Sequence, residues 1–94
     1  MEFDESLFRN IDLNSLFTLL LIYREQGVSK TAELLHVKQP AVSNTLAKLR
    51  CHFHDPLFVR HAHGVKPTAK ATEIIQHLEA GFQDIQNALL IAAR

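Results

Sequence analysis

The C-terminal third of the chain carries an apolar repeat that restricts the fold more than any other feature of the sequence. Seven apolar residues recur there at alternating intervals of four and three: Ala71, Ile75, Leu78, Phe82, Ile85, Leu89 and Ala92. These intervals place side chains on one stripe of an α-helix, as at the a and d positions of a coiled coil. The repeat therefore predicts a helix over about residues 69–92, roughly 36 Å long at about 1.5 Å per residue.

A helix of this length is too long to be covered by the rest of so short a chain. We expect the first half of the apolar stripe to pack within the chain and the second half to pack against a partner helix. An apolar stripe left exposed over its whole length would be unusual in a stable monomer. The residues predicted to hold a homodimer together are Ile75, Leu78, Phe82, Ile85 and Leu89.

The 94-residue chain has room for one domain, and its net charge of zero hides an uneven distribution. Residues 24–70 contain eight Lys and Arg against three Asp and Glu, a net charge of +5. Residues 1–23 carry a net charge of −3, and residues 71–94 carry −2. A basic segment between acidic ends favours a polyanionic partner such as nucleic acid.

Two helices are predicted before the middle of the chain. The first covers residues 13–25, with Asp12 as its N-cap and Gly27 as the left-handed residue after its last turn. The second is short, from residue 30 to about residue 36, with Ser29 as its N-cap.

A third helix is predicted over about residues 40–53, because Pro40 suits a first helical turn. Its buried stripe comprises Val42, Leu46, Leu49 and Phe53. At 100° per residue, Asn44, Lys48 and Cys51 point away from that stripe. A short helix, a four-residue connection and a helix with a free polar face are typical of a helix-turn-helix, in which the second helix reads base edges.

Two short β-prone runs follow, over residues 57–60 and 65–68, and residues 61–64 join them as a hairpin. Pro67 restricts the second run to an edge strand. Thr68 then serves as the N-cap of the long last helix.

These elements predict a mainly α fold, a winged helix-turn-helix with a two-stranded wing and a long C-terminal dimerisation helix. We divide the chain into an N-terminal arm (1–11), the winged helix-turn-helix domain (12–68) and the linker helix (69–94).

Other classes of function find little support. The longest apolar run, residues 19–23, is too short to cross a bilayer, and the single cysteine excludes an internal disulfide, so we expect a cytoplasmic protein. The Cys and His residues at 51–54 and 61–63 match no structural zinc pattern, so no metal or other cofactor is expected. Cys51 with the nearby histidines is the one candidate combination of a nucleophile with a general base. So small a chain offers little cleft for an active site, so we do not expect an enzyme.

The residues of the helical segments carry a family resemblance. Residues 12–17 (DLNSLF), 28–35 (VSKTAELL) and 39–50 (QPAVSNTLAKLR) closely resemble the N-terminal motif of LysR-type transcriptional regulators. Residues 55–60 (DPLFVR) and 64–68 (GVKPT) resemble the wing of that family, especially in its nodulation-regulator-like branch. The resemblance extends in unbroken order over about residues 11–92.

This resemblance implies sequence-specific binding to double-stranded promoter DNA, with the helix over about 40–53 in the major groove and the wing, 57–68, at the minor groove. It also implies antiparallel pairing of the linker helices in dimers and tetramers. The positions that match the family's DNA contacts are Ser29, Lys30, Thr31, Gln39, Pro40, Ser43, Asn44, Thr45, Arg60, His63 and Lys66. Lys48 is added because cations gathered within one such motif favour phosphate contact.

Two departures from the family pattern affect the expected function. Family members often have Arg where Asn44 and His63 stand. In addition, the 94 residues of the sequence include no match to the family's C-terminal effector-binding domain, so we assign no inducer-sensing role to the chain. The competing interpretation is a protein-interaction module, in which the heptad helix binds a partner and the helix-turn-helix is a scaffold. DNA binding weakened by salt favours the first interpretation, and salt-insensitive self-association favours the second.

Overall fold

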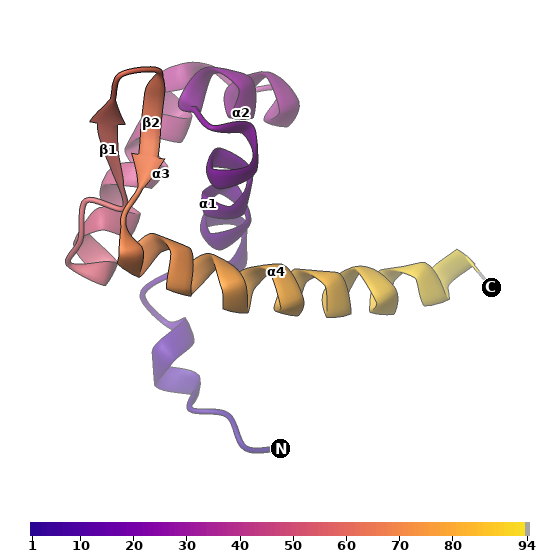
Figure 1. Cartoon of the computed structure of the whole chain (residues 1–94). Helices are drawn as coiled ribbons and strands as arrows, with labels where there is room; N and C mark the ends of the chain where they lie inside the picture. Colours follow the sequence, from indigo (N-terminus) through magenta and orange to yellow (C-terminus); the bar gives the residue numbers. More distant parts are fainter. Residues whose placement is uncertain (94) are drawn as a thin grey trace.

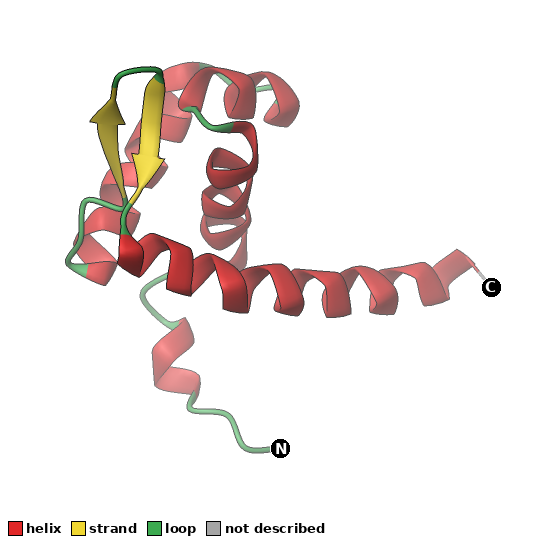
Figure 2. Ribbon diagram, viewed as in Figure 1, coloured by secondary structure: helices red, strands yellow, loops and turns green. Residues whose placement is uncertain are grey.

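One apolar core joins three helices, a two-stranded hairpin and the first turns of a long fourth helix. The computed structural model describes residues 1–93, and Figure 1 shows the long helix extending away from the other elements. In chain order the elements are η1 (Glu5–Phe8), α1 (Leu13–Glu25), α2 (Val28–Leu35), α3 (Gln39–Phe53), β1 (Phe58–His61), β2 (Gly64–Pro67), α4 (Ala69–Leu90) and η2 (Ile91–Ala93). Figure 2 shows the hairpin beside the helices, which confirms a mainly α winged helix with a long C-terminal helix.

The core takes apolar side chains from α1, α2, α3, the wing and the start of α4. Its buried members are Leu19, Ile22, Ala32, Val42, Leu46, Leu49, Leu57, Phe58, Ala71 and Ile75. Three of the four residues predicted to form the inner stripe of α3 are buried, and the fourth, Phe53, is partly buried against them.

The ends of α1 and α2 differ in part from the prediction. Asp12 caps α1 as expected, since its Oδ1 accepts a hydrogen bond from the Ser15 N–H (2.7 Å). The left-handed residue after α1 is Gln26 (φ 59°), whereas Gly27 has extended backbone (φ 168°). Gly27 is also the N-cap of α2, so the prediction that Ser29 caps this helix was wrong.

The third helix begins one residue earlier than predicted. Lys38 is its N-cap, so Gln39 and Pro40 both lie in its first turn. A proline is accommodated there because the first N–H groups of a helix have no partner within the helix. The helix ends at Phe53, and the left-handed backbone of His54 (φ 52°) turns the chain toward the wing.

The wing is an antiparallel hairpin whose register pairs Phe58 with Pro67 and Arg60 with Val65. The first strand lies one residue later than the predicted run 57–60, and the second lies one residue earlier than the predicted run 65–68. Gly64 has φ 128°, a backbone conformation that residues with a Cβ rarely adopt.

The exposure of the α4 stripe rises along the helix. Ile75 is 3% exposed, Ile85 is 40% exposed and Leu89 is 70% exposed. The prediction that Ile75 contacts a partner was therefore wrong, because this side chain belongs to the chain's own core. Within residues 1–93, none of the helices has the length and hydropathy needed to cross a membrane. Arg94, the last residue of the predicted 69–94 segment, lies outside the described residues.

Asp55 connects the wing to the start of α4. Its Oδ2 accepts hydrogen bonds from the Thr68 hydroxyl (2.7 Å) and the Leu57 N–H (2.8 Å). Thr68 in turn caps α4, since its Oγ1 accepts from the Ala71 N–H (3.1 Å). The Leu57 bond also holds that buried residue in left-handed backbone (φ 65°), which is unfavourable for a residue with a Cβ.

These contacts lower the pKa of Asp55 from its usual value of 3.8, mainly through the Thr68 hydroxyl and then the Leu57 N–H. Partial burial opposes this shift, and the charge of Lys70 adds to it. A lowered pKa in the folded state stabilises the fold above the unfolded value, and that stabilisation is lost as the pH falls through the folded pKa.

We predict that Asp55→Asn lowers the melting temperature by several degrees at pH 7, because the charged acceptor of both hydrogen bonds is lost. The difference from the wild type should shrink when unfolding is measured well below pH 3.8, where the carboxyl of the wild type is protonated as well. Asp84→Asn, at an exposed position of α4, is the control for general charge effects. A difference that is equal at both pH values would contradict the role of the charge.

Candidate nucleic-acid interface

The polar face of α3 lies opposite the stripe that packs into the core. Val42, Leu46 and Leu49 are buried, whereas Ser43, Asn44 and Lys48 are exposed. The first turn of α3 is exposed as well, including Gln39 and Pro40, and Thr45 on the flank is partly buried. Burial of one stripe therefore leaves the predicted base-reading residues accessible on the other side of the helix.

The start of α2 lies beside the start of α3. The Gln39 Nε2 donates a hydrogen bond to the Ser29 Oγ (2.5 Å), although ten residues separate the two in the chain. Ser29 and Lys30 are exposed, but Thr31 is fully buried and its hydroxyl donates to the Gly27 carbonyl (2.8 Å). The Thr31 side chain is therefore not available to contact DNA as predicted, because it is buried on the inner side of α2.

The hairpin register distributes the predicted wing contacts over different surfaces. Cross-strand partners lie on the same face, and successive residues lie on opposite faces. Arg60 pairs with Val65 and so shares a face with the buried Phe58, whereas Lys66 lies on the opposite face. Arg60 lines a recess of about 400 Å³ between the wing and α1, α2 and α3. His63 occupies the exposed turn between the strands.

Among residues 1–93, the cations of this surface form no ion pair with an acidic side chain. Within residues 1–93 the one ion pair joins Arg24 to Glu25 (2.7 Å), away from the predicted site. Lys38, the exposed N-cap of α3, adds a cation that the sequence analysis did not include among the site residues. Its place in the basic segment, directly before the third helix, is the signal that could have identified it.

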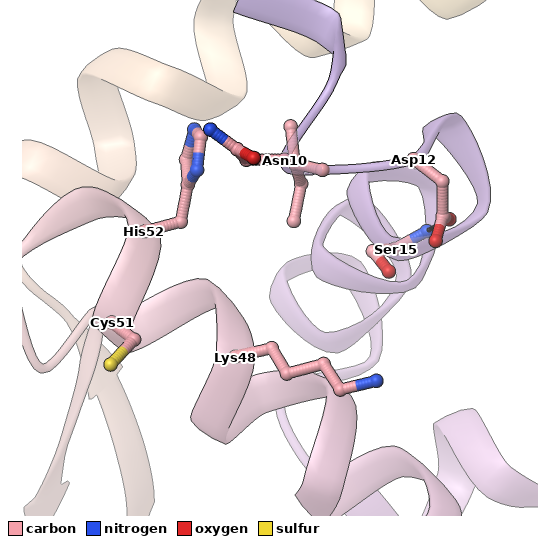
Figure 3. A pocket seen from close by; sticks show the side chains of 7 residues that line it. Asn10, Asp12, Ser15, Lys48, Cys51 and His52 are labelled. Atoms are coloured by element: carbon pink, nitrogen blue, oxygen red, sulfur yellow. Dashed lines mark hydrogen bonds between the residues drawn. The ribbon is translucent and has the colours of Figure 1, made fainter.

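A recess of about 430 Å³ lies between the outer side of α3 and the segment that leads into α1. Figure 3 shows the Lys48 side chain extending from α3 toward the first turn of α1, where Ser15 lies. Asn10 and His52 also line this recess. Local sequence patterns do not connect Asn10 and Ser15 with the site, because only the packing of α1 on α3 brings them near Lys48. Within residues 1–93, no group of three His, Cys, Asp or Glu side chains is arranged to hold a metal ion.

A second surface, mostly apolar, lies between α1 and the exposed half of α4. It is a groove of about 660 Å³, and the rings of Phe17 and Phe82 meet in it with their centroids 5.4 Å apart. The residues that line it are Phe17, Leu20, Tyr23, Arg24, Glu79, Phe82, Gln83, Ile85, Gln86 and Leu89. Three predicted dimer residues, Phe82, Ile85 and Leu89, thus share one groove.

A helix-turn-helix with an exposed polar second helix, a hairpin wing beside it and a long C-terminal helix define a winged helix-turn-helix domain. The family model described as a bacterial regulatory helix-turn-helix protein of the lysR family matches residues 13–72. The chain belongs to the LysR family.

Relatives of the chain are transcriptional regulators. The chain is 38% identical over 88 residues to the HTH-type transcriptional regulator LeuO of Escherichia coli, covering 94% of this chain and 28% of LeuO. It is 41% identical over 81 residues to the HTH-type transcriptional activator NahR of Pseudomonas putida, covering 86% of this chain and 27% of NahR. The chain therefore spans little more than a quarter of the length of these relatives.

Solved structures share the fold. A probable transcriptional regulator from Pseudomonas aeruginosa superposes with a TM-score of 0.80 at 30% identity, covering 88% of this chain and 28% of that one. The BenM DNA-binding domain, solved in complex with catB site 1 DNA, superposes with a TM-score of 0.79 at 21% identity. That match covers 89% of this chain and 94% of the BenM chain, so the fold matches almost an entire DNA-binding domain.

Proposed function

We propose that this chain binds double-stranded promoter DNA sequence-specifically, as the DNA-binding domain of a LysR-type transcriptional regulator. The observation that carries the proposal is the exposed polar face of α3 beside cations that have no acidic partner within the described part of the chain. Family membership and the DNA complex of the similarly folded BenM domain support it. Because bacterial DNA lies in the cytoplasm, we expect the protein to act there, as a regulator and not as an enzyme.

In this proposal the first turns of α3 enter the major groove. The amides of Gln39 and Asn44 are suited to adenine, which offers one acceptor and one donor there. Pro40, Ser43 and the partly buried Thr45 complete the face that meets the bases. Lys30 and Lys48 are assigned to phosphates, whose contacts fix the register without reading sequence.

The wing is proposed to reach the minor groove through the turn that holds His63, with Lys66 on its outer face. Arg60 lies on the inner face of the hairpin and lines the recess toward α2. We assign Arg60 to a phosphate near the start of α2 and His63 to the groove itself. The two assignments differ because Arg60 faces the helices from within β1, whereas His63 lies in the exposed turn between the strands.

We predict that Asn44→Ala and Lys48→Ala have different effects on DNA binding. Asn44→Ala should weaken binding to the preferred site by roughly 1–3 kcal/mol and leave binding to random duplex unchanged, because it removes a base contact. Lys48→Ala should weaken both alike and reduce the slope of log affinity against log salt by about 1. Fluorescence anisotropy at several salt concentrations measures both effects, with Gln76→Ala on the exposed side of α4 as the control.

If both variants changed both DNAs equally, the division of α3 into base-reading and phosphate-binding residues would be incorrect. If the wild-type chain bound no duplex at low salt, the alternative protein-interaction function would replace the proposal. Salt-insensitive self-association without DNA would support that alternative.

We also propose that the chain forms a homodimer through the groove between α1 and α4. The exposed half of α4 carries apolar side chains that its own chain does not cover, and an identical helix packed antiparallel offers the same stripe in return. Phe82, Ile85 and Leu89 lie at the centre of this contact, with Leu78 at its edge. Chain segments 1–11, 12–68 and 69–94 then act as arm, DNA-binding domain and linker helix.

We predict that Ile85→Asp and Leu89→Asp each yield monomers, because either change buries an unpaired carboxylate in the proposed interface. Both side chains are exposed in the single chain, so its own core should remain intact. Phe82→Asp is less informative because Phe82 also packs on Phe17. Sedimentation at micromolar concentration checks the outcome, with Asn87→Asp on exposed α4 as the matched control. A wild-type chain that sedimented as a monomer would refute the dimer.

A further inference from the structure

The hydrogen bond between Ser29 and Gln39 joins the first turn of α2 to the first turn of α3. The Ser29 hydroxyl does not cap α2, because Gly27 occupies that position and has no side chain to accept a bond. It accepts instead from the Gln39 Nε2 (2.5 Å). Both residues are exposed on the proposed DNA-binding surface, so the bond contributes little to the core of the fold.

The chemistry of a primary amide gives this bond a consequence for base recognition. Glutamine carries two N–H donors on one side of its amide and one carbonyl acceptor on the other. When one N–H is directed to Ser29, the amide has one N–H and one carbonyl oxygen left. That pair matches adenine, which presents the N7 acceptor and the N6 donor in the major groove.

The opposite orientation of the same amide would have a different preference. If the carbonyl oxygen faced Ser29, both N–H groups would point outward. Two donors match guanine, which presents the N7 and O6 acceptors. The direction of the bond to Ser29 therefore decides which purine the glutamine favours, and in this structure the Ser29 hydroxyl is the acceptor, which leaves the pair that matches adenine pointing outward.

We propose that Ser29 is a specificity-determining positioning residue that orients the Gln39 amide toward adenine and away from guanine. The inference rests on the proposed function, since it requires α3 to lie in the major groove. Ser29 acts here through Gln39. The bond also orders a long side chain before DNA arrives, which lowers the entropy lost on binding.

The test begins with the full chain and a library of randomised duplexes, from which the wild type selects its preferred site. Gln39→Ala then identifies the base pair that Gln39 reads, as the one whose adenine preference disappears. Ser29→Ala should reduce discrimination between adenine and guanine at that pair by roughly 2- to 10-fold, the range for one hydrogen bond. Ser29→Thr, which keeps a hydroxyl, should restore the discrimination.

The double variant Ser29→Ala/Gln39→Ala separates this role from a direct phosphate contact. If Ser29 acts through Gln39, the double variant and Gln39→Ala should behave alike on every duplex. If Ser29→Ala weakens binding to all duplexes equally, and does so in both backgrounds, Ser29 contacts phosphate and the inference is overturned. Discrimination left unchanged by Ser29→Ala overturns it as well.

Failure of the inference and failure of the proposed function give different results. A wild-type chain that selects no site refutes sequence-specific binding itself. A wild-type chain that selects a site whose purine preference ignores Ser29 refutes only the inference. The melting temperature of each variant checks that it is folded. We expect the Ser29 variants to fold, because Ser29 is exposed.

Discussion

The packing of α1 against the inner stripe of α3 is the contact on which the rest of the structure depends. Leu19 and Ile22 of α1 and Leu49 of α3 are all at most 1% exposed, and burial of each contributes about 1.5–3 kcal/mol. Because the stripe recurs with the helical period, its burial also fixes the rotation of α3 about its axis. The polar residues of α3 then face outward in a fixed direction, although they add little to stability themselves. The fold and the proposed DNA-binding surface are thus two sides of one helix.

The uneven charge distribution favours an orientation of the chain in which that surface faces a polyanion. The net charge is zero, but the segment from residue 24 to residue 70 is positive and both flanking segments are negative. The fold gathers most of the positive segment into α2, α3 and the wing, while the acidic residues of the two flanking segments lie on the arm, at the start of α1 and on α4. Attraction to phosphate at one end and repulsion at the other orient the chain before any close contact forms.

The two halves of the long helix α4 have different structural roles. Its first turns complete the core through Ala71 and Ile75, and the cap formed by Thr68 ties it to Asp55. Its second half projects from the domain with apolar side chains exposed. In the proposed dimer, this projection sets the separation and relative direction of two recognition helices, as half-site spacing requires of paired helix-turn-helix domains. A rigid helix suits this task because its length is set by its number of residues.

The sequence by itself determined the features that depend on neighbouring residues. The stripes of α3 and α4, the caps Asp12 and Thr68 and the hairpin after Pro56 all follow from local periodicity and capping chemistry, and the structure confirms them. Tertiary structure decided which of the predicted side chains are free to act. Thr31 and Ile75 match the expected patterns yet are buried, and Arg60 lines a recess between the wing and the helices, whereas Lys66 lies on the opposite face of the hairpin. The sequence predicts that Ser29 caps a helix, but its hydroxyl accepts a hydrogen bond from the side chain of Gln39, ten residues away. Such outcomes depend on contacts between elements that are distant in the chain, and local spacing carries no information about them.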